Sequence, residues 1–191
     1  MIYPIVAYGD VVLRQVGEKI DKNYPELAEL IASMFETMKH ANGVGLAAPQ
    51  IGLAIRLFVI DSHPMFEEMD DDDPLKEEGE PLRKVFINAE KIAETGKELV
   101  YAEGCLSIPG VSEDVVRPDT LRLRYFDENF KQHEETFTGL NARVIQHEYD
   151  HIEGVLFIDY LKPLKKRLLR RRLEKISKGE IPTRYRMRLP K

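Results

Sequence analysis

The sequence predicts an α+β protein whose strands form an antiparallel sheet, and three observations lead to this fold class. Apolar residues recur at helical spacing in several segments. Apolar and charged residues alternate from 121 to 125, as in a half-exposed strand. The turn-forming residues 127–129 then allow residues 133–138 to return as an antiparallel partner.

Length and composition predict one domain. The chain has 191 residues, of which 43% are hydrophobic and 32% are charged, as is typical of a single globular unit. We expect residues 1–178 to form this domain and residues 179–191 to form a flexible C-terminal tail. No apolar run approaches the ~20 residues that a membrane helix needs, so no membrane partner is expected.

The first predicted helix begins after Pro25 and ends near Gly43. Its apolar residues share one face and belong to the core: Leu27, Leu30, Ile31, Met34 and Met38. Buried strands are predicted at 56–61 and 85–92, which carry apolar runs. The acidic stretch from 62 to 83 is too polar to pack and is predicted to be a mobile surface loop.

The second predicted helix begins after Gly139 and ends at Gly154, which can adopt the left-handed conformation of a helix cap. The third helix runs from Pro163 to Ser177 and is amphipathic. Its apolar stripe is expected to face the core: Leu164, Leu168, Leu169 and Leu173. Basic residues crowd the same segment: Lys162, Lys165, Lys166, Arg167, Arg170, Arg171 and Arg172.

The cysteine count and the start of the chain indicate a reducing compartment. Cys105 is the single cysteine, so no internal disulfide can form. Residues 1–8 lack the basic and apolar segments of a secretory signal. We therefore expect a cytoplasmic protein. The net charge of -5 argues against DNA binding or general nucleic-acid binding by the whole surface.

The second helix carries the His-Glu-x-x-His motif His147-Glu148-Tyr149-Asp150-His151. Its two imidazoles stand one turn apart on one face, where they can bind one metal ion. Glu148 is offset by about 100° and could take a proton from a water activated by the metal. The alternative is a chance match on a solvated helix, but Leu140 and Val144 share the face of the histidines and direct it toward the core.

A hydrolytic metal site normally has three protein ligands and one open position. A protease pattern with a third histidine is excluded, because Phe157 occupies that place. Glu174 is a second candidate, although it lies among basic residues on a separate helix. Cys105 is the remaining candidate. A lone cysteine is commonly a small buried hydrophobe, but Gly104 and Pro109 around it suit a loop that presents a ligand.

Three short motifs carry a resemblance to a known family. They are Gly43-Val44-Gly45-Leu46-Ala47-Ala48-Pro49-Gln50, Glu103-Gly104-Cys105-Leu106-Ser107 and Gln146-His147-Glu148-Tyr149-Asp150-His151. With these motifs in this order, the chain resembles the bacterial peptide deformylases over most of its length. The resemblance implies antiparallel sheets packed around a central metal-binding helix, with the basic amphipathic helix at the C-terminal side.

The resemblance also implies a role for each site residue. The family's metal ligands match Cys105, His147 and His151, and its catalytic acid/base matches Glu148. Gln50 and the backbone N–H of Leu106 match the groups that stabilise its oxyanion. The implied cofactor is one divalent metal ion. Fe2+ is expected first, with Zn2+, Ni2+ or Co2+ as alternatives, because one thiolate and two imidazoles suit several ions.

The residues assigned to substrate binding are Val44, Gly45, Glu103, Gly104, Arg143 and Val144. Val44, Val144 and the stem of Arg143 could form an apolar pocket for a methionine side chain. The guanidinium of Arg143 must then reach solvent or pair, because burying it unpaired is costly. Glu103 is expected to pair with Arg117 and so fix the cysteine loop.

We therefore expect a metal-dependent hydrolase that removes the N-formyl group from the N-terminal methionine of new polypeptides and releases formate. Its partners would be N-formylmethionyl nascent peptides. The basic third helix either forms a solvated face or contacts the ribosome through RNA phosphates. Two alternatives stay open: a zinc endopeptidase with another third ligand, and a non-enzymatic ribosome-binding module whose metal is only structural.

Overall fold

Helices and strands both occur in the structure, a computed structural model that describes residues 1–70 and 79–190. The strands are β1 (Ile5–Val6), β2 (Gly45–Ala47), β3 (Leu57–Asp61), β4 (Arg83–Cys105), β5 (Ile108–Phe126), β6 (Gln132–Thr138) and β7 (Met187–Arg188). The α-helices are α1 (Leu27–His40), α2 (His63–Glu68), α4 (Gly139–Ile152) and α5 (Pro163–Ser177). Short 3-10 helices span Val11–Arg14, Ala48–Ile51 and Phe157–Tyr160.

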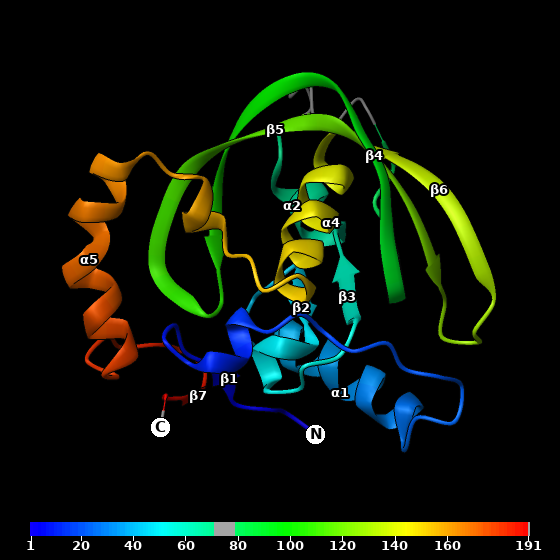
Figure 1. Cartoon of the computed structure of the whole chain (residues 1–191), viewed down its shortest axis with the longest axis horizontal. Coiled ribbons are helices and arrows are strands. Elements are labelled where there is room, and N and C mark those ends of the chain that lie inside the picture. Colours follow the sequence, from blue (N-terminus) through cyan, green and yellow to red (C-terminus); the bar gives the residue numbers. More distant parts are fainter. Residues whose placement is uncertain (71–78, 191) are drawn as a thin grey trace.

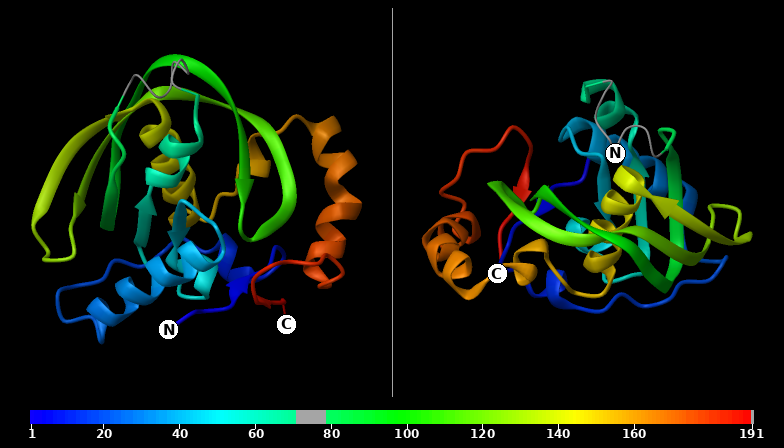
Figure 2. Two further views of the ribbon diagram at one scale, coloured as in Figure 1. Left: turned by 180° about the vertical axis from the view of Figure 1, so that it is seen from behind. Right: turned by 90° about the horizontal axis from the view of Figure 1, so that it is seen from above.

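The main sheet has five strands in the order β2-β3-β4-β5-β6, and every neighbouring pair is antiparallel, as predicted. β4 and β5 form a long hairpin, and its register shifts at several points along the pair. Such β-bulges bend and twist a pair of strands. In Figure 1 the hairpin arches over α4, and Figure 2 shows from behind that α5 lies outside this arch.

Side chains alternate between the two faces of β3 and therefore enter two different parts of the core. Phe58 and Ile60 join a buried cluster that includes the apolar residues of α4. Leu57 and Val59 join a second cluster, to which α1 contributes Met34. α4 and α1 thus cover opposite faces of the sheet, and α4 is fixed between the curved hairpin and β3.

α4 is buried around its whole circumference. All of its residues except His147 are buried, although the helix contains many polar side chains. Buried polar groups need partners, so this helix depends on side-chain pairing as well as on apolar packing. Gly154 follows the helix with φ 70°, the left-handed conformation that was predicted. A β-carbon there would collide with the carbonyl group of Arg14.

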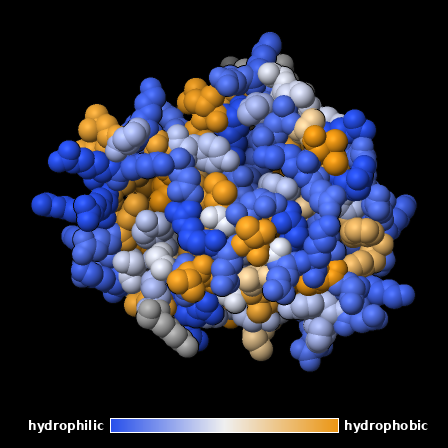
Figure 3. All heavy atoms as spheres, in the orientation of Figure 1, coloured by the Kyte–Doolittle hydropathy of each residue, from blue (hydrophilic) through white to orange (hydrophobic). Residues whose placement is uncertain are grey.

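α5 has the predicted bounds, but only part of its apolar stripe is buried. Leu173 and Ile176 are 8% and 2% exposed and pack against residues of β5. Leu164 and Leu168 are 70% and 73% exposed, so the prediction that they face the core is wrong. Periodicity shows which residues share a helix face, but not whether anything lies against that face. Figure 3 shows a largely hydrophilic surface with separated hydrophobic side chains, and none of the described helices is long and apolar enough to cross a membrane.

The acidic stretch from 62 to 83 is not a loop throughout. Its first part forms α2, in which Phe66 is 6% exposed. Pro64 in the first turn favours helix initiation, and Phe66 supplies an apolar contact that a count of charges overlooks. The remainder of the predicted mobile loop includes residues 71–78, which lie outside the described residues.

The segment after α5, which the sequence predicts to be a flexible tail, contains a short strand. β7 pairs in parallel with β1, and the backbone N–H groups of Ile5 and Ala7 donate to the carbonyls of Arg186 and Arg188 at 2.9 and 2.8 Å. Ile181 packs against the cluster beneath α5. This pairing left no sign in the sequence, because a two-residue strand has no periodic signal and its partner lies at the other end of the sequence.

Candidate metal centre and active site

The three predicted metal ligands meet at one point, where the end of β4 lies against α4. Cys105 ends β4 opposite Ile108, while His147 and His151 lie one turn apart on α4. One ligand atom from each residue lies within 4.8 Å of the other two. Cys105 Sγ lies 3.3 Å from His151 Nε2.

These side chains have the chemistry and spacing of a mononuclear metal site. A tetrahedral ion with bonds of about 2.0–2.3 Å places its ligand atoms roughly 3.5 Å apart. Nδ1 of His147 lies 3.0 Å from Glu103 Oε2, so its Nε2 is the nitrogen available to an ion. Burial and the nearby positive charges of His147 and Arg117 hold the pKa of His151 well below its ordinary value, which keeps its ring neutral.

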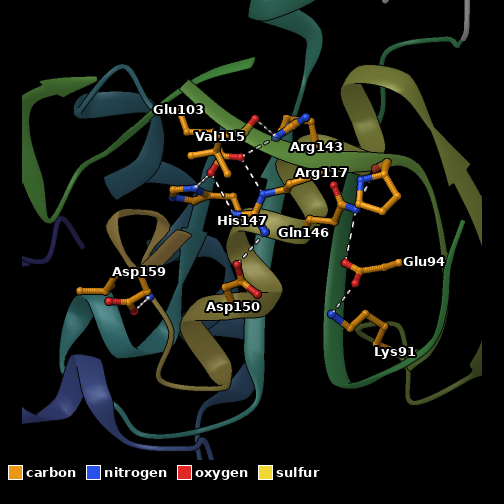
Figure 4. Close-up of polar contacts among 12 residues, drawn as sticks. Lys91, Glu94, Glu103, Val115, Arg117, Arg143, Gln146, His147, Asp150 and Asp159 are labelled. Atoms are coloured by element: carbon orange, nitrogen blue, oxygen red, sulfur yellow. Dashed lines mark hydrogen bonds and ion pairs between the residues drawn. The ribbon is translucent and has the colours of Figure 1, made fainter. Parts of the chain in front are cut away.

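Glu103 lies at the centre of a buried ionic network (Figure 4). Its carboxylate accepts hydrogen bonds from Arg117 Nε at 2.6 Å and from Arg143 at 2.9 Å. Arg117 also donates to Asp150 Oδ2 at 2.7 Å. Burial alone would raise the pKa of Glu103, but His147 and Arg117 outweigh it and hold this pKa well below its usual range. The expected Glu103–Arg117 ion pair is therefore present, and Glu103 stays ionised beside His147.

The sequence required the guanidinium of Arg143 either to reach solvent or to pair. In the structure it is buried and paired with Glu103. In addition to Glu103, it donates to the backbone carbonyls of Val115 and Leu99 at 3.0 and 2.6 Å. Its aliphatic stem can therefore line an apolar pocket without exposing the charge.

The carboxylate of Glu148 is buried beside the ligands. Its Oε2 has no hydrogen-bond partner among the described residues. Burial raises the pKa of Glu148 to about 7, although the neighbouring His147 acts in the opposite direction. Gly45 lies directly against this carboxylate, and a β-carbon at that position would collide with it. The glycine in the first sequence motif therefore makes room for Glu148.

Gln50 is held in a defined orientation by the 3-10 helix Ala48–Ile51. Its Oε1 accepts the backbone N–H of Ala47 at 2.8 Å, so the Nε2 amide points away from that contact. This Nε2 lies 3.5 Å from both Cys105 Sγ and Ser107 Oγ. The side chain thus presents N–H donors next to the metal ligands.

A cavity of about 520 Å³ opens beside these residues. Its lining contains most of the residues that the sequence selected: Val44, Gly45, Gln50, Glu103, Gly104, Cys105, Leu106, Arg143, Val144, His147 and Glu148. The remaining one, His151, is 1% exposed and does not line the cavity. Glu174, the rival third ligand, is exposed and paired with Lys178 at 2.7 Å on a different helix.

Sequence reasoning missed part of the pocket wall. Residues 182–185, which were assigned to the tail, line the cavity together with residues 108–111. The hydroxyl of Tyr185 donates to the carbonyl of Leu106 at 2.8 Å, and the backbone N–H of Tyr8 donates to the carbonyl of Ser107 at 2.9 Å. The turn after Cys105 is thus held from both sides. Only the nearness of residues 108–111 to Cys105 offered a sequence signal; residues 182–185 offered none.

Two histidines and a thiol around one point, with a buried carboxylate and an amide donor at a pocket, define a metal-dependent hydrolase of the type that keeps one ligand position open. Comparison with known families is more specific. The sequence model described as polypeptide deformylase matches residues 2–167, and the chain belongs to that family.

Individual relatives agree with this assignment. The peptide deformylase of Christiangramia forsetii is 55% identical over 190 residues, which cover 100% of this chain and 97% of the relative. The crystal structure of a peptide deformylase from Legionella pneumophila is similar with a TM-score of 0.77 at 38% identity, covering 94% of this chain and 98% of that one. A Plasmodium falciparum peptide deformylase structure gives a TM-score of 0.78 at 30% identity, covering 92% and 95% of the two chains.

Proposed function

We propose that this chain is a peptide deformylase, which hydrolyses the formyl amide of N-formylmethionyl nascent peptides and releases formate. The observation that carries the proposal is the convergence of Cys105, His147 and His151 with the buried carboxylate of Glu148 at one end of a cavity. Membership of the polypeptide deformylase family supports the same substrate class.

Cys105, His147 and His151 would hold one divalent metal ion. When bound, the ion would supply Lewis-acid activation of water and polarisation of the formyl oxygen. Fe2+ is our expected ion, with Zn2+, Ni2+ and Co2+ as alternatives, because a thiolate and two imidazoles accommodate each of them. The ionised Glu103 would fix the orientation of the His147 ring through its Nδ1, as a partner behind a metal ligand characteristically does.

Glu148 would act as the acid/base. With a pKa of about 7, its carboxylate can accept a proton from the attacking water at neutral pH and return it to the leaving amine. The Nε2 of Gln50 and the backbone N–H of Leu106 would donate hydrogen bonds to the oxyanion. One such donor is typically worth about 3 kcal/mol in the transition state.

The methionine side chain would occupy the apolar part of the cavity. Val44, Val144 and the stem of Arg143 would supply its walls, since the guanidinium of Arg143 is paired elsewhere. The small residues Gly45 and Gly104, with the backbone at Glu103, would leave space for the peptide chain of the substrate. We place the reaction in the cytoplasm, where new polypeptides carry the formyl group.

α5 is the segment that we propose for contact with the ribosome. Its exposed basic residues and the exposed Leu164 and Leu168 leave a face that the described residues do not cover. Phosphate neutralisation by such residues makes binding fall with salt concentration. Cosedimentation with ribosomes should therefore weaken in Arg167→Glu and Arg171→Glu variants. Unchanged, salt-independent sedimentation would contradict the proposal.

The direct test of the activity is formate release from a formyl-Met dipeptide by protein purified without oxygen, so that the thiol survives. We expect rapid release, while an acetyl-Met analogue and internal peptide bonds stay intact. Cys105→Ser should lose metal and activity, whereas Glu174→Gln should retain both. Metal-loaded, folded protein that releases no formate would refute the proposed function.

A further inference from the structure

Among the residues that the structure describes, the lining of the cavity contains one exposed charge. Glu103, Arg143 and Glu148 also line it, but their exposed fractions are 4%, 6% and 4%, and the first two are neutralised within the ionic network. Arg184 lines the same cavity and is exposed. It has no acidic partner among the described residues. A peptide entering the cavity therefore meets a cation that no acidic side chain of residues 1–70 or 79–190 neutralises.

The backbone that carries Arg184 is held firmly at the cavity wall. On one side Thr183 Oγ1 donates to the carbonyl of Tyr185 at 2.7 Å, and on the other the Tyr185 hydroxyl donates to the carbonyl of Leu106 at 2.8 Å. β7 then pairs with β1. Arg184 therefore belongs to a backbone segment that is attached to the rest of the molecule through Tyr185 and β7.

A second exposed arginine reaches the same region from a different element. Arg172 on α5 extends its guanidinium directly against Gly110, which itself lines the cavity. A β-carbon on Gly110 would collide with that guanidinium. Arg172 has no acidic partner among the described residues, so two unneutralised cations border the pocket.

We infer that Arg184, assisted by Arg172, makes this chain prefer substrates with an acidic side chain shortly after the formylmethionine. This inference rests on the proposed function, because it assigns the peptide beyond its first residue to the part of the cavity bordered by residues 182–185. The methionine side chain would contact a different set of residues, Val44 and Val144 among them. An exposed ion pair at such a rim is worth a few-fold in affinity and is weakened by salt.

The test compares amidated peptides formyl-Met-Ala-Xaa-Ala in which Xaa is Glu, Gln or Lys, so that the side chain is the only variable charge. For the wild-type protein we expect kcat/KM to be about three-fold higher with Glu than with Gln, and lower again with Lys. Arg184→Glu should reverse this order, and Arg172→Glu should reduce the ratio in the same direction. Raising the salt concentration should bring the wild-type ratio toward one.

Arg186→Glu is the matched control, because Arg186 is a neighbouring exposed arginine that does not line the cavity. It changes the net charge equally and should leave the Glu-to-Gln ratio as in the wild type. One outcome would overturn the charge preference alone. In it the Gln peptide releases formate, but the Glu-to-Gln ratio of kcat/KM is near one in both the wild type and Arg184→Glu. If Arg186→Glu lowered the Glu-to-Gln ratio as much as Arg184→Glu does, the preference would also be overturned, because the net charge of the protein would then explain it. No release from any peptide would instead refute the proposed function.

Discussion

Oε2 of Glu103 lies 3.0 Å from Nδ1 of His147, and the same carboxylate is shared by Arg117 and Arg143. One buried anion therefore contacts a candidate metal ligand on α4 and also neutralises positive charge on two buried arginines. Its removal should affect both the metal site and the fold. The two effects can be measured separately.

Replacement of Glu103 by Gln should weaken metal binding by about 10–100-fold, because the ring of His147 loses its charged partner. It should also lower the free energy of unfolding by up to about 3–5 kcal/mol, because the buried charge of Arg143 loses its acidic partner while Arg117 keeps only Asp150. Metal titration and urea unfolding measure the two quantities. The exposed Glu98→Gln on the same strand should change neither, and unaltered metal affinity in Glu103→Gln would contradict the positioning role.

Glu148→Ala should abolish turnover while the protein keeps its metal. The reason is that Glu148 is the only carboxylate proposed to move a proton, whereas the ligands come from Cys105, His147 and His151. We expect kcat to fall by at least about a hundredfold. Metal content and circular dichroism should match the wild type. A variant with normal turnover would exclude Glu148 as the acid/base.

Gly45→Ala should displace the Glu148 carboxylate, because the added β-carbon has no free space beside it. We expect a loss of kcat larger than the accompanying loss of thermal stability. Gly104→Ala is the comparison, since its β-carbon would meet only the carbonyl of Val111 at 3.7 Å, an ordinary contact. Because Gly104 lies at the proposed substrate wall, that change should act on KM and leave kcat unaltered. If the two variants were equally active, the close approach of Gly45 to Glu148 would have no catalytic importance.

Tyr185→Phe should lower kcat by roughly five-fold with little change in KM for formyl-Met peptides, because one neutral hydrogen bond is worth about 1 kcal/mol. Burial raises the pKa of Tyr185 to about 12, so its hydroxyl stays protonated and donates to the carbonyl of Leu106. Steady-state kinetics give the split between kcat and KM. Tyr3→Phe, at a tyrosine that does not line the cavity, serves as the control, and equal kinetics of the two variants would argue against a role for this bond.

Asp159 should contribute stability that depends on pH. Burial raises its pKa, but hydrogen bonds from Arg14 and from the backbone N–H of Leu156 outweigh burial, so the folded-state pKa lies below its ordinary value. The stabilisation is therefore present above the unfolded pKa of about 3.9 and is lost as the pH falls through the folded value.

Asp159→Asn should accordingly be about 0.5 kcal/mol less stable than the wild type at pH 7, because the pair with Arg14 is partly exposed and screened. Urea unfolding from pH 7 to pH 3 should show this difference shrinking as the wild-type carboxylate becomes protonated. The exposed Asp114→Asn variant reports the effect of removing one negative charge alone. A difference that persists at pH 3 would mean that the ion pair is not its source.

The elements that the sequence predicted well are those with a local signal. α4 and α5 follow helical periodicity and have recognisable ends at Gly154 and Pro163, and the hairpin of β5 and β6 follows strict alternation. The grouping of Cys105, His147 and His151 was predictable because each of the three lies in a short motif with its own chemistry. Cys105 by itself could have been a small buried hydrophobe or a metal ligand, and its neighbours in the motif favoured the metal ligand.

What the sequence could not predict depends on contacts between distant segments. The shared use of Glu103 by Arg117, Arg143 and His147 requires three elements to meet, and no local pattern encodes that meeting. The same holds for residues 182–185, whose place in the cavity wall depends on β7 pairing with β1. The exposure of Leu164 was likewise unpredictable, because it depends on whether another segment packs against that face of α5.

The pairing of β1 with β7 also bears on the order in which the molecule folds. It joins two segments that are almost the whole described chain apart, and closing such a long loop costs entropy before any contact repays it. Cys105 is much nearer in sequence to the histidines of α4, and the hairpin connects them. The metal ligands should therefore come together first and the wall at residues 182–185 last, so that a refolding chain can capture an ion before it can discriminate between peptides.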